Sequence, residues 1–221
     1  MKKYLLWAAG LYFLFRAVSS NKNGEVSPIT RDWLNADEKV TMKWADIAMR
    51  WGVAMGMDPA LIMGCIYSES SGIENRTRWE SERGESSYGL MQVLWSTAQD
   101  ILGWLKEENY GINPSYSLTE SDLVNPNFNI MLGTRYLVKQ YLRYASALGK
   151  DRVYSMFAAY NAGTARKNAA GQFIDSAGNI RVNTYVQKCV NAAQRFRAIL
   201  IVEYPTYAAA FPMSTWQYSG F

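Results

Sequence analysis

The 221-residue chain contains no histidine. Its absence removes the imidazole that serves many hydrolases as a general base, the Ser–His and Cys–His nucleophile pairs, and the commonest side-chain ligand of metal ions. Acid and base chemistry in this protein must therefore be carried by carboxyl groups.

Cysteine is scarce as well, because only Cys65 and Cys189 are present. Two thiols are too few for a thiolate zinc site, and they lie too far apart for a C-x-x-C redox motif. We therefore expect neither a metal nor a cofactor. Both cysteines are predicted to be core residues, and the alternative is a disulfide between them.

The sequence has no block of charge of one sign. Its 23 lysines and arginines and its 19 aspartates and glutamates give a net charge of +4 and are scattered along the chain. This pattern does not indicate a nucleic-acid-binding protein. A mild positive field favours approach to an anionic surface, although solubility alone explains the same charge.

The first residues lack an apolar run long enough to span a bilayer. Two lysines are followed by twelve largely apolar residues, Tyr4 to Phe15, and then by Arg16, whereas a membrane-spanning helix needs about 20. Residues 1–20 are therefore interpreted as a signal-like segment, with small residues at Ala17-Val18-Ser19 for cleavage. The alternative is a retained anchor or a helix that binds a partner protein.

The remaining chain is predicted to form one globular domain with a tail. Residues 21–28 are polar and turn-rich and are interpreted as a linker. Residues 29–203 are long enough to bury a proper core, given a hydrophobic content of 49% in the whole chain. Residues 204–221 are rich in aromatic residues and either wrap over the domain or bind a partner.

The domain is predicted to be mainly helical. Asp58-Pro59 and Asn125-Pro126 each combine an N-cap residue with a proline at the first helical position. Apolar spacing and further start and stop signals predict helices over 44–55, from Ser96 (a capping box with Gln99) to about 108, from Asp151 to Gly163, and from Thr184 to 203.

Strands are expected in one place only. Residues 172–182 contain two β-prone arms around a glycine turn and are interpreted as a small hairpin. Residues 73–87 are charged and lack periodicity, which predicts a solvated loop. The expected fold class is therefore mainly α, a compact multi-helix domain with one small β-hairpin.

Glu69 stands out within the helix that follows Asp58. It continues the stripe formed by Ile62, Cys65 and Ile66 at helical spacing, so its carboxyl group is expected on a buried face. Burial disfavours the charged form and raises the pKa, which suits a general acid. The alternative is a structural glutamate that is hydrogen-bonded at a helix end.

Four segments stand in a characteristic order: Glu69-Ser70-Ser71-Gly72, Tyr88-Gly89-Leu90-Met91-Gln92, Ala159-Tyr160-Asn161-Ala162-Gly163 and Tyr185-Val186-Gln187-Lys188. Together they resemble the lytic transglycosylases of the soluble lytic transglycosylase family, which cleave bacterial peptidoglycan. The resemblance covers roughly residues 45 to 200. It implies a lysozyme-like α+β fold.

The resemblance also implies site residues. Glu69 is the expected catalytic acid, and the expected substrate-binding residues are Gln92, Tyr160, Asn161, Tyr185, Ser87 and Gly89. An amide such as that of Gln92 can donate and accept hydrogen bonds to sugar groups, and Gly89 lets the backbone pass close to a ligand.

Several of these residues have alternatives. Asn161 is equally suited to be a helix C-cap, and Tyr185 to be a core residue. The segment before Gly89 is longer than in the family, so the alternatives to Ser87 as the serine that orients the acid are Ser86 or neither serine. Leu94-Trp95 also departs from the family, where methionine and proline are common.

The implied reaction uses no water. Glu69 protonates the oxygen between N-acetylmuramic acid and N-acetylglucosamine, and its carboxylate then takes the proton of the muramic 6-hydroxyl, which closes a 1,6-anhydro ring. The implied partner is the peptidoglycan glycan strand, and no nucleic acid is expected. Residues 1–18 and the tail are the expected contacts to a membrane or a protein machine.

Two other functions are left open. A goose-type lysozyme-like hydrolase would use water and a second carboxylate, for which Glu80, Glu82 and Glu85 are the candidates. A wall-docking structural protein of a virion or secretion machine would bind sugar without cleaving it. The expected place of action is the bacterial periplasm or cell wall, reached by export, by anchoring or in a phage virion.

Overall fold

The structure is a computed structural model that describes residues 34–147 and 149–212. The signal-like segment 1–20, the linker 21–28, the first residues of the expected domain and the end of the tail lie outside the described residues. Within the described part of the chain, no helix is both long and apolar enough to cross a membrane.

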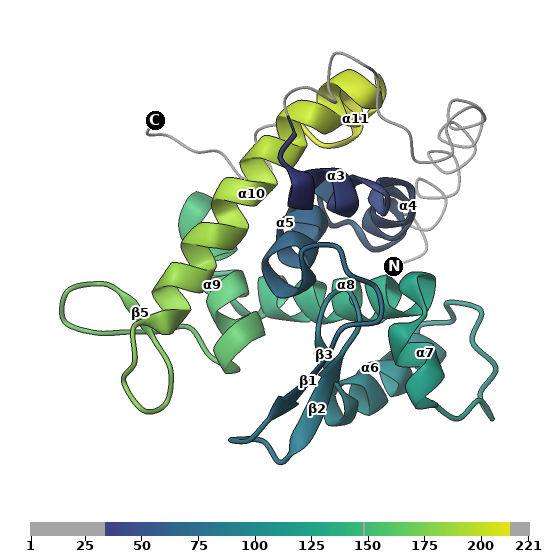
Figure 1. Cartoon of the computed structure of the whole chain (residues 1–221), viewed down its shortest axis with the longest axis horizontal. Helices are drawn as coiled ribbons and strands as arrows, with labels where there is room; N and C mark the ends of the chain where they lie inside the picture. Colours follow the sequence, from purple (N-terminus) through teal and green to yellow (C-terminus); the bar gives the residue numbers. More distant parts are fainter. Residues whose placement is uncertain (1–33, 148, 213–221) are drawn as a thin grey trace.

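Helices dominate the described residues, which confirms the mainly α class. In chain order they are α3 (Ala36–Met42), α4 (Ala45–Met55), α5 (Pro59–Ser70), α6 (Trp95–Glu107), α7 (Glu120–Val124), α8 (Pro126–Arg143), α9 (Gly149–Ala162), α10 (Arg181–Glu203) and α11 (Tyr207–Ala210). The long helix α10 packs along α5, and α8 lies on the other side of α5 (Figure 1).

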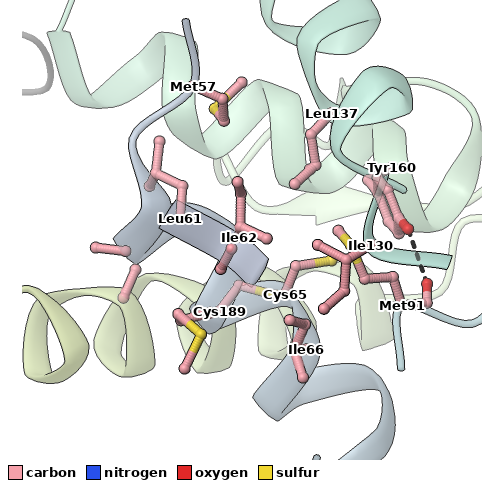
Figure 2. Close-up of a cluster of buried hydrophobic side chains, with 14 of the residues drawn as sticks. Met57, Leu61, Ile62, Cys65, Ile66, Met91, Ile130, Leu137, Tyr160 and Cys189 are labelled. Atoms are coloured by element: carbon pink, nitrogen blue, oxygen red, sulfur yellow. Dashed lines mark hydrogen bonds between the residues drawn. The ribbon is translucent and has the colours of Figure 1, made fainter. Parts of the chain in front are cut away.

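Helix α5 is buried along nearly its whole length. Asp58 caps its first turn by accepting a 2.9 Å hydrogen bond from the Ala60 N–H, and Pro59 occupies the first helical position, as predicted. Gly64 allows α10 to approach closely, because a Cβ there would lie 2.5 Å from the Cys189 carbonyl oxygen. Figure 2 shows the apolar cluster that α5 forms with Ile130 of α8 and Cys189 of α10.

Helix α8 also begins where the sequence predicts. The Asn125 side chain accepts a 3.1 Å hydrogen bond from the Phe128 N–H, and Pro126 is the first helical residue. The start of α6 differs from the prediction, because Leu94 and not Ser96 precedes the helix. The Ser96 N–H instead donates to the Glu85 carboxylate at 2.8 Å, so a neighbouring strand supplies the cap.

The segment predicted as a solvated loop is in fact a hairpin. Strands β1 (Thr77–Glu80) and β2 (Glu85–Tyr88) pair antiparallel, and β3 (Val93–Leu94) extends them to a three-stranded sheet. Most side chains of β1 and β2 are polar, so these strands lack the apolar alternation that marks a half-buried strand. Backbone pairing therefore forms here without a sequence signal.

The hairpin predicted over residues 172–182 is shifted. Its first arm, β5 (Phe173–Ile174), pairs with the upstream strand β4 (Arg166–Lys167). Its second arm is instead the start of α10 at Arg181. The Asp175 carboxylate accepts hydrogen bonds from the N–H groups of Ala177 and Asn179, which folds residues 175–179 into a turn rather than a second strand.

The described part of the tail packs on the domain. Tyr207 of α11 is fully buried, and its hydroxyl donates to the Asp58 carboxylate at 2.5 Å. Arg197 of α10 binds the same carboxylate at 2.7 Å and donates to the Phe211 carbonyl oxygen at 2.6 Å. This buried cluster ties residues 207–211 to the beginning of α5.

Cys65 and Cys189 are both free thiols and fully buried. The prediction of core residues is correct, and the alternative disulfide is not formed. Cys65 faces the Tyr185 hydroxyl at 3.8 Å, so the thiols lie in the interface between α5 and α10.

Candidate active site

A cleft of about 560 Å³ opens beside the C-terminal end of α5. Its walls are the β1–β2 hairpin on one side and residues 160–163 with the beginning of α10 on the other. All the site residues predicted from the sequence except Gly89 line it: Glu69, Ser87, Gln92, Tyr160, Asn161 and Tyr185.

Glu69 lies in the last turn of α5 and is only 7% exposed. Its Oε1 accepts a 2.7 Å hydrogen bond from the Tyr185 hydroxyl. Burial raises the pKa of Glu69 from 4.5 to about 7, against the opposing effects of this hydrogen bond and of the Arg78 charge. The carboxyl group is therefore able to hold a proton near neutral pH and to release it.

Tyr185 and Tyr160 have different partners. Tyr185 contacts the carboxyl group of Glu69 directly. The Tyr160 hydroxyl donates a 2.7 Å hydrogen bond to the Met91 carbonyl oxygen, shown as a dashed line in Figure 2. The Tyr160 ring packs against Tyr136 at a centroid distance of 5.1 Å. Tyr160 therefore holds the loop that carries Met91, while its ring contributes to the cleft wall.

The side chain of Gln92 forms its hydrogen bonds with other groups of the protein. Its side-chain amide donates to the carbonyl oxygens of Arg76 and Gly89, both at 2.9 Å, and its Oε1 accepts a 3.0 Å bond from the Ser87 hydroxyl. Gln92 also has a positive φ of 45°, which these bonds stabilise. The same hydroxyl of Ser87 lies 2.9 Å from Glu80 Oε1. Gln92 and Ser87 therefore brace the hairpin against the loop.

Gly89 is required by packing. It has a φ of +73°, and a Cβ there would lie 2.4 Å from the Leu123 carbonyl oxygen and 2.5 Å from Asn129 Nδ2. Leu90 and Met91, which follow Gly89, are fully buried core residues.

Asn129 of α8 holds this loop in place. Its Oδ1 accepts a 2.8 Å bond from the Met91 N–H, and its Nδ2 donates to the carbonyl oxygens of Tyr88 and Leu123. Asn129 was not predicted as a site residue. Its position one turn after the Asn125-Pro126 cap places it on the predicted helix, but nothing in the sequence marks it as a site residue.

The three candidates for a second catalytic carboxylate, Glu80, Glu82 and Glu85, lie at different positions relative to the cleft. Glu80 lines the cleft, where its Oε1 accepts from the Arg78 guanidinium at 2.6 Å, and its charge acts on Glu69. Glu82 lies on the rim and pairs with Arg181 at 3.0 Å. Glu85 caps α6 and does not line the cleft.

The arginines of the hairpin and of the start of α10, which are Arg78, Arg83 and Arg181, were not anticipated as cleft residues. Arg181 pairs with Asp175 at 2.9 Å as well as with Glu82, so it bridges the two walls. The polar character of residues 78–83 is the only sequence signal for these contacts. Among the described residues, no group of three or more acidic, cysteine or histidine side chains is placed to hold a metal ion.

Comparisons with known proteins give the same fold and family. The chain is 33% identical over 139 residues to the endo-type membrane-bound lytic murein transglycosylase A of Salmonella paratyphi B and of Salmonella enteritidis. The match covers 60% of this chain and 59% of those relatives, so the chain spans less than two thirds of their length.

Solved structures match at lower identity. The 70-kDa soluble lytic transglycosylase of Escherichia coli has a TM-score of 0.55 and 19% identity, over 87% of this chain and 33% of that chain. An inactive mutant of the lytic transglycosylase Slt from Pseudomonas aeruginosa has a TM-score of 0.53 and 20% identity, over 75% and 26%. These likenesses establish the lysozyme-like fold.

The family defined as the transglycosylase SLT domain matches residues 46–179, which is more than half of the chain. This range begins in α4 and includes Glu69, the β1–β2 hairpin, the loop with Gln92 and the end of α9. The protein is therefore a member of the transglycosylase SLT domain family.

Proposed function

We propose that this protein is a peptidoglycan lytic transglycosylase that cleaves the β-1,4 bond between N-acetylmuramic acid and N-acetylglucosamine. The observation that carries the proposal is the buried carboxyl group of Glu69, which lies in the wall of a polar cleft with a pKa raised to about 7. A carboxylic acid that is protonated near neutral pH is the group that a leaving sugar oxygen requires.

Glu69 first donates its proton to the glycosidic oxygen, and the C1–O bond of the muramic residue breaks. The acetamido group of the substrate stabilises the oxocarbenium-like carbon. The Glu69 carboxylate then takes the proton of the muramic 6-hydroxyl, whose oxygen bonds to C1 and closes the 1,6-anhydro ring. Glu69 ends the cycle protonated, so no water is consumed.

Tyr185 supports both halves of this cycle. Its hydroxyl donates to Glu69 Oε1 at 2.7 Å and therefore stabilises the carboxylate that forms after the first proton transfer. Because the other oxygen, Oε2, accepts no bond from Tyr185, it remains the oxygen that carries the proton to the substrate. Tyr185 is thus proposed as the residue that orients the acid.

The remaining predicted residues are proposed to act mainly on the shape of the cleft. Ser87, Gln92 and Gly89 fix the hairpin and the loop beside Glu69, and Tyr160 fixes the same loop through Met91. Asn161 lines the cleft at the end of α9 and is proposed to contact sugar groups.

The second candidate function is hydrolysis, and the observation that favours it is the position of Glu80 in the cleft. Glu80 lines the same cleft, where Arg78 donates to its Oε1 and the Ser87 hydroxyl lies 2.9 Å from the same oxygen, which leaves Oε2 able to hold a water molecule. A hydrolase of this kind would release a muramic product with a free reducing end.

Mass spectrometry of the soluble products from purified peptidoglycan separates these functions, since an anhydro product is lighter than a hydrolysis product by one water. The proposal expects anhydro products from the wild type and none from Glu69→Gln. Glu74→Gln, an exposed carboxylate outside the cleft, is the matched control and should retain activity. Reducing-end products that depend on Glu80 would favour the hydrolase, and binding without release would favour a docking protein.

The proposed partner is the glycan strand, and the proposed place of action is the periplasm or cell wall. Export or anchoring through residues 1–20 is part of the proposal. Two observations support it: the signal-like pattern of that segment and the membrane-bound description of the Salmonella relatives.

A further inference from the structure

Two guanidinium groups meet at one edge of the cleft, which we call the Gly163 rim (Arg83, Arg143 and Gly163). Gly163 lines the cleft immediately after α9. Arg143 Nη1 donates a 2.8 Å hydrogen bond to the Gly163 carbonyl oxygen, and Arg83 Nη2 lies 3.8 Å from the position that a Cβ on Gly163 would occupy.

The two arginines reach this rim from different elements. Arg83 lies in the turn between β1 and β2 and lines the cleft, and Arg143 is the last residue of α8. Both are exposed, and both lie near enough to the Tyr136 phenol for their charges to act on it. The arrangement thus concentrates positive charge beside Tyr136, itself a cleft residue.

The other arginines of the cleft are neutralised. Arg78 pairs with Glu80, and Arg181 pairs with both Glu82 and Asp175. Neither Arg83 nor Arg143 forms an ion pair with a carboxylate within residues 34–147 and 149–212. Asp100 also acts on Tyr136, but less than either arginine, and accepts no hydrogen bond from them.

We propose that the Gly163 rim binds a carboxylate of the peptide stem that is attached to the muramic residue of the substrate. This inference rests on the proposed function and adds the recognition of peptide-bearing strands to it. It assigns Arg83 and Arg143 as specificity-determining residues, whereas Glu69 remains the catalytic residue.

The chemistry of the strand selects this ligand. The sugar hydroxyls and acetamido groups of the glycan are neutral, so the carboxylates of the stem are the anions that accompany the strand into the cleft. A guanidinium presents several N–H donors in a planar fork that matches a carboxylate. Arg143 uses one Nη1 donor for Gly163, and its other N–H groups donate to none of the residues that the structure describes, so they can donate to a ligand.

The test compares two substrates made from the same preparation: intact peptidoglycan strands and strands from which an amidase has removed the stems. For the Arg83→Gln/Arg143→Gln double variant, the ratio of kcat/KM for intact strands to kcat/KM for stripped strands should fall about 10-fold, the low end for losing hydrogen bonds to a charged group. The wild type should prefer intact strands, and this preference should weaken with added salt.

Arg50→Gln is the matched control, because Arg50 is exposed, makes a single hydrogen bond to Asn127 and does not line the cleft. Its ratio should equal that of the wild type. The Arg83→Lys/Arg143→Lys variant keeps the charges but loses the planar guanidinium groups. Its ratio of kcat/KM values should lie between that of the wild type and that of the Arg83→Gln/Arg143→Gln variant. Equal losses on both substrates, or no change in the ratio, would overturn the proposal. Loss of the preference after removal of wall phosphate polymers, with the stems intact, would also overturn it and assign the rim to phosphate.

A binding measurement separates this inference from the proposed function. In a Glu69→Gln background, sedimentation with intact strands should exceed sedimentation with stripped strands, and the two arginine substitutions should remove the difference. If the wild type cleaves neither substrate, the proposed function fails, and this binding difference still decides whether the rim recognises stems.

Discussion

The Tyr185 hydroxyl donates a 2.7 Å hydrogen bond to Oε1 of Glu69, from a helix that follows 116 residues later in the chain. The contact exists because α10 packs along α5 at Gly64, where a larger residue would meet the Cys189 carbonyl oxygen. The environment of the acid is therefore set by the close crossing of two helices.

Tyr185→Phe should move the alkaline limb of kcat/KM to higher pH. The reaction begins with protonated Glu69, so activity falls as pH rises through its pKa of about 7. The Tyr185 hydrogen bond stabilises the carboxylate and lowers this pKa, and its removal therefore raises the pKa further. The measurement is a pH–rate profile on purified peptidoglycan.

Tyr154→Phe is the control, because Tyr154 lies on α9 outside the cleft, and its profile should equal that of the wild type. An alkaline limb that stays in place or moves to lower pH in Tyr185→Phe would show that Tyr185 does not act on the titrating group.

Glu69→Gln should stabilise the protein at alkaline pH. The folded chain holds the Glu69 proton up to a pKa of about 7, whereas the ordinary value is 4.5, so stability is lost as pH rises between these values. At about 1.4 kcal/mol per pKa unit, burial of the carboxylate costs on the order of 3 kcal/mol above pH 7. Glutamine does not ionise and avoids this cost.

Urea unfolding at pH 4 and at pH 8 measures the effect. The free energy of unfolding of Glu69→Gln relative to the wild type should increase by about 3 kcal/mol between the two pH values. Glu74→Gln, at an exposed position, should show a much smaller change. A difference for Glu69→Gln that does not depend on pH would mean that its carboxyl group titrates normally in the folded protein.

The sequence was sufficient to predict features that are encoded locally. The caps at Asp58 and Asn125 and the buried stripe that ends at Glu69 depend on residues within one or two helical turns. The β1–β2 hairpin could not be predicted in this way, because residues such as Arg78 and Glu80 pair with each other on an exposed strand and leave no apolar alternation.

The roles within the site depend on distant contacts and were less predictable. Gln92 suits a sugar ligand by its chemistry, but the turn at Gly89 brings two backbone carbonyl oxygens within its reach. Tyr160 was expected to bind the substrate, but its hydroxyl reaches Met91, and Tyr185 supplies the direct hydrogen bond to Glu69. Neither outcome is visible without the packing of α8, α9 and α10.

Asn129→Ala should destabilise the fold by about 2–4 kcal/mol, because it leaves the buried Met91 N–H and two carbonyl oxygens without their side-chain partner. Activity should fall as well, since the loop beside Glu69 loses its support. Asn191→Ala, an exposed asparagine on α10, should change the free energy of unfolding little. Urea unfolding of both variants checks this, and equal stabilities would exclude Asn129 as the support of the loop.

The two cysteines should be counted as free thiols in the protein denatured without reductant. Both are buried, and burial raises the pKa of the Cys65 thiol well above its ordinary value and that of Cys189 to about 12. The reactive thiolates are therefore scarce, and the folded protein should resist alkylation at pH 8, whereas unfolding should expose two thiols per chain.

A second experiment measures activity after partial unfolding in the presence of an alkylating agent and refolding. A group added to Cys65 would occupy the space beside the Tyr185 hydroxyl, 3.8 Å away, and should abolish activity after refolding by displacing Tyr185 from Glu69. The Cys65→Ala variant should survive the same treatment with more of its activity. A count of no thiols in the denatured protein would mean that Cys65 and Cys189 are bonded, and that the crossing of α5 and α10 is held covalently rather than by packing at Gly64.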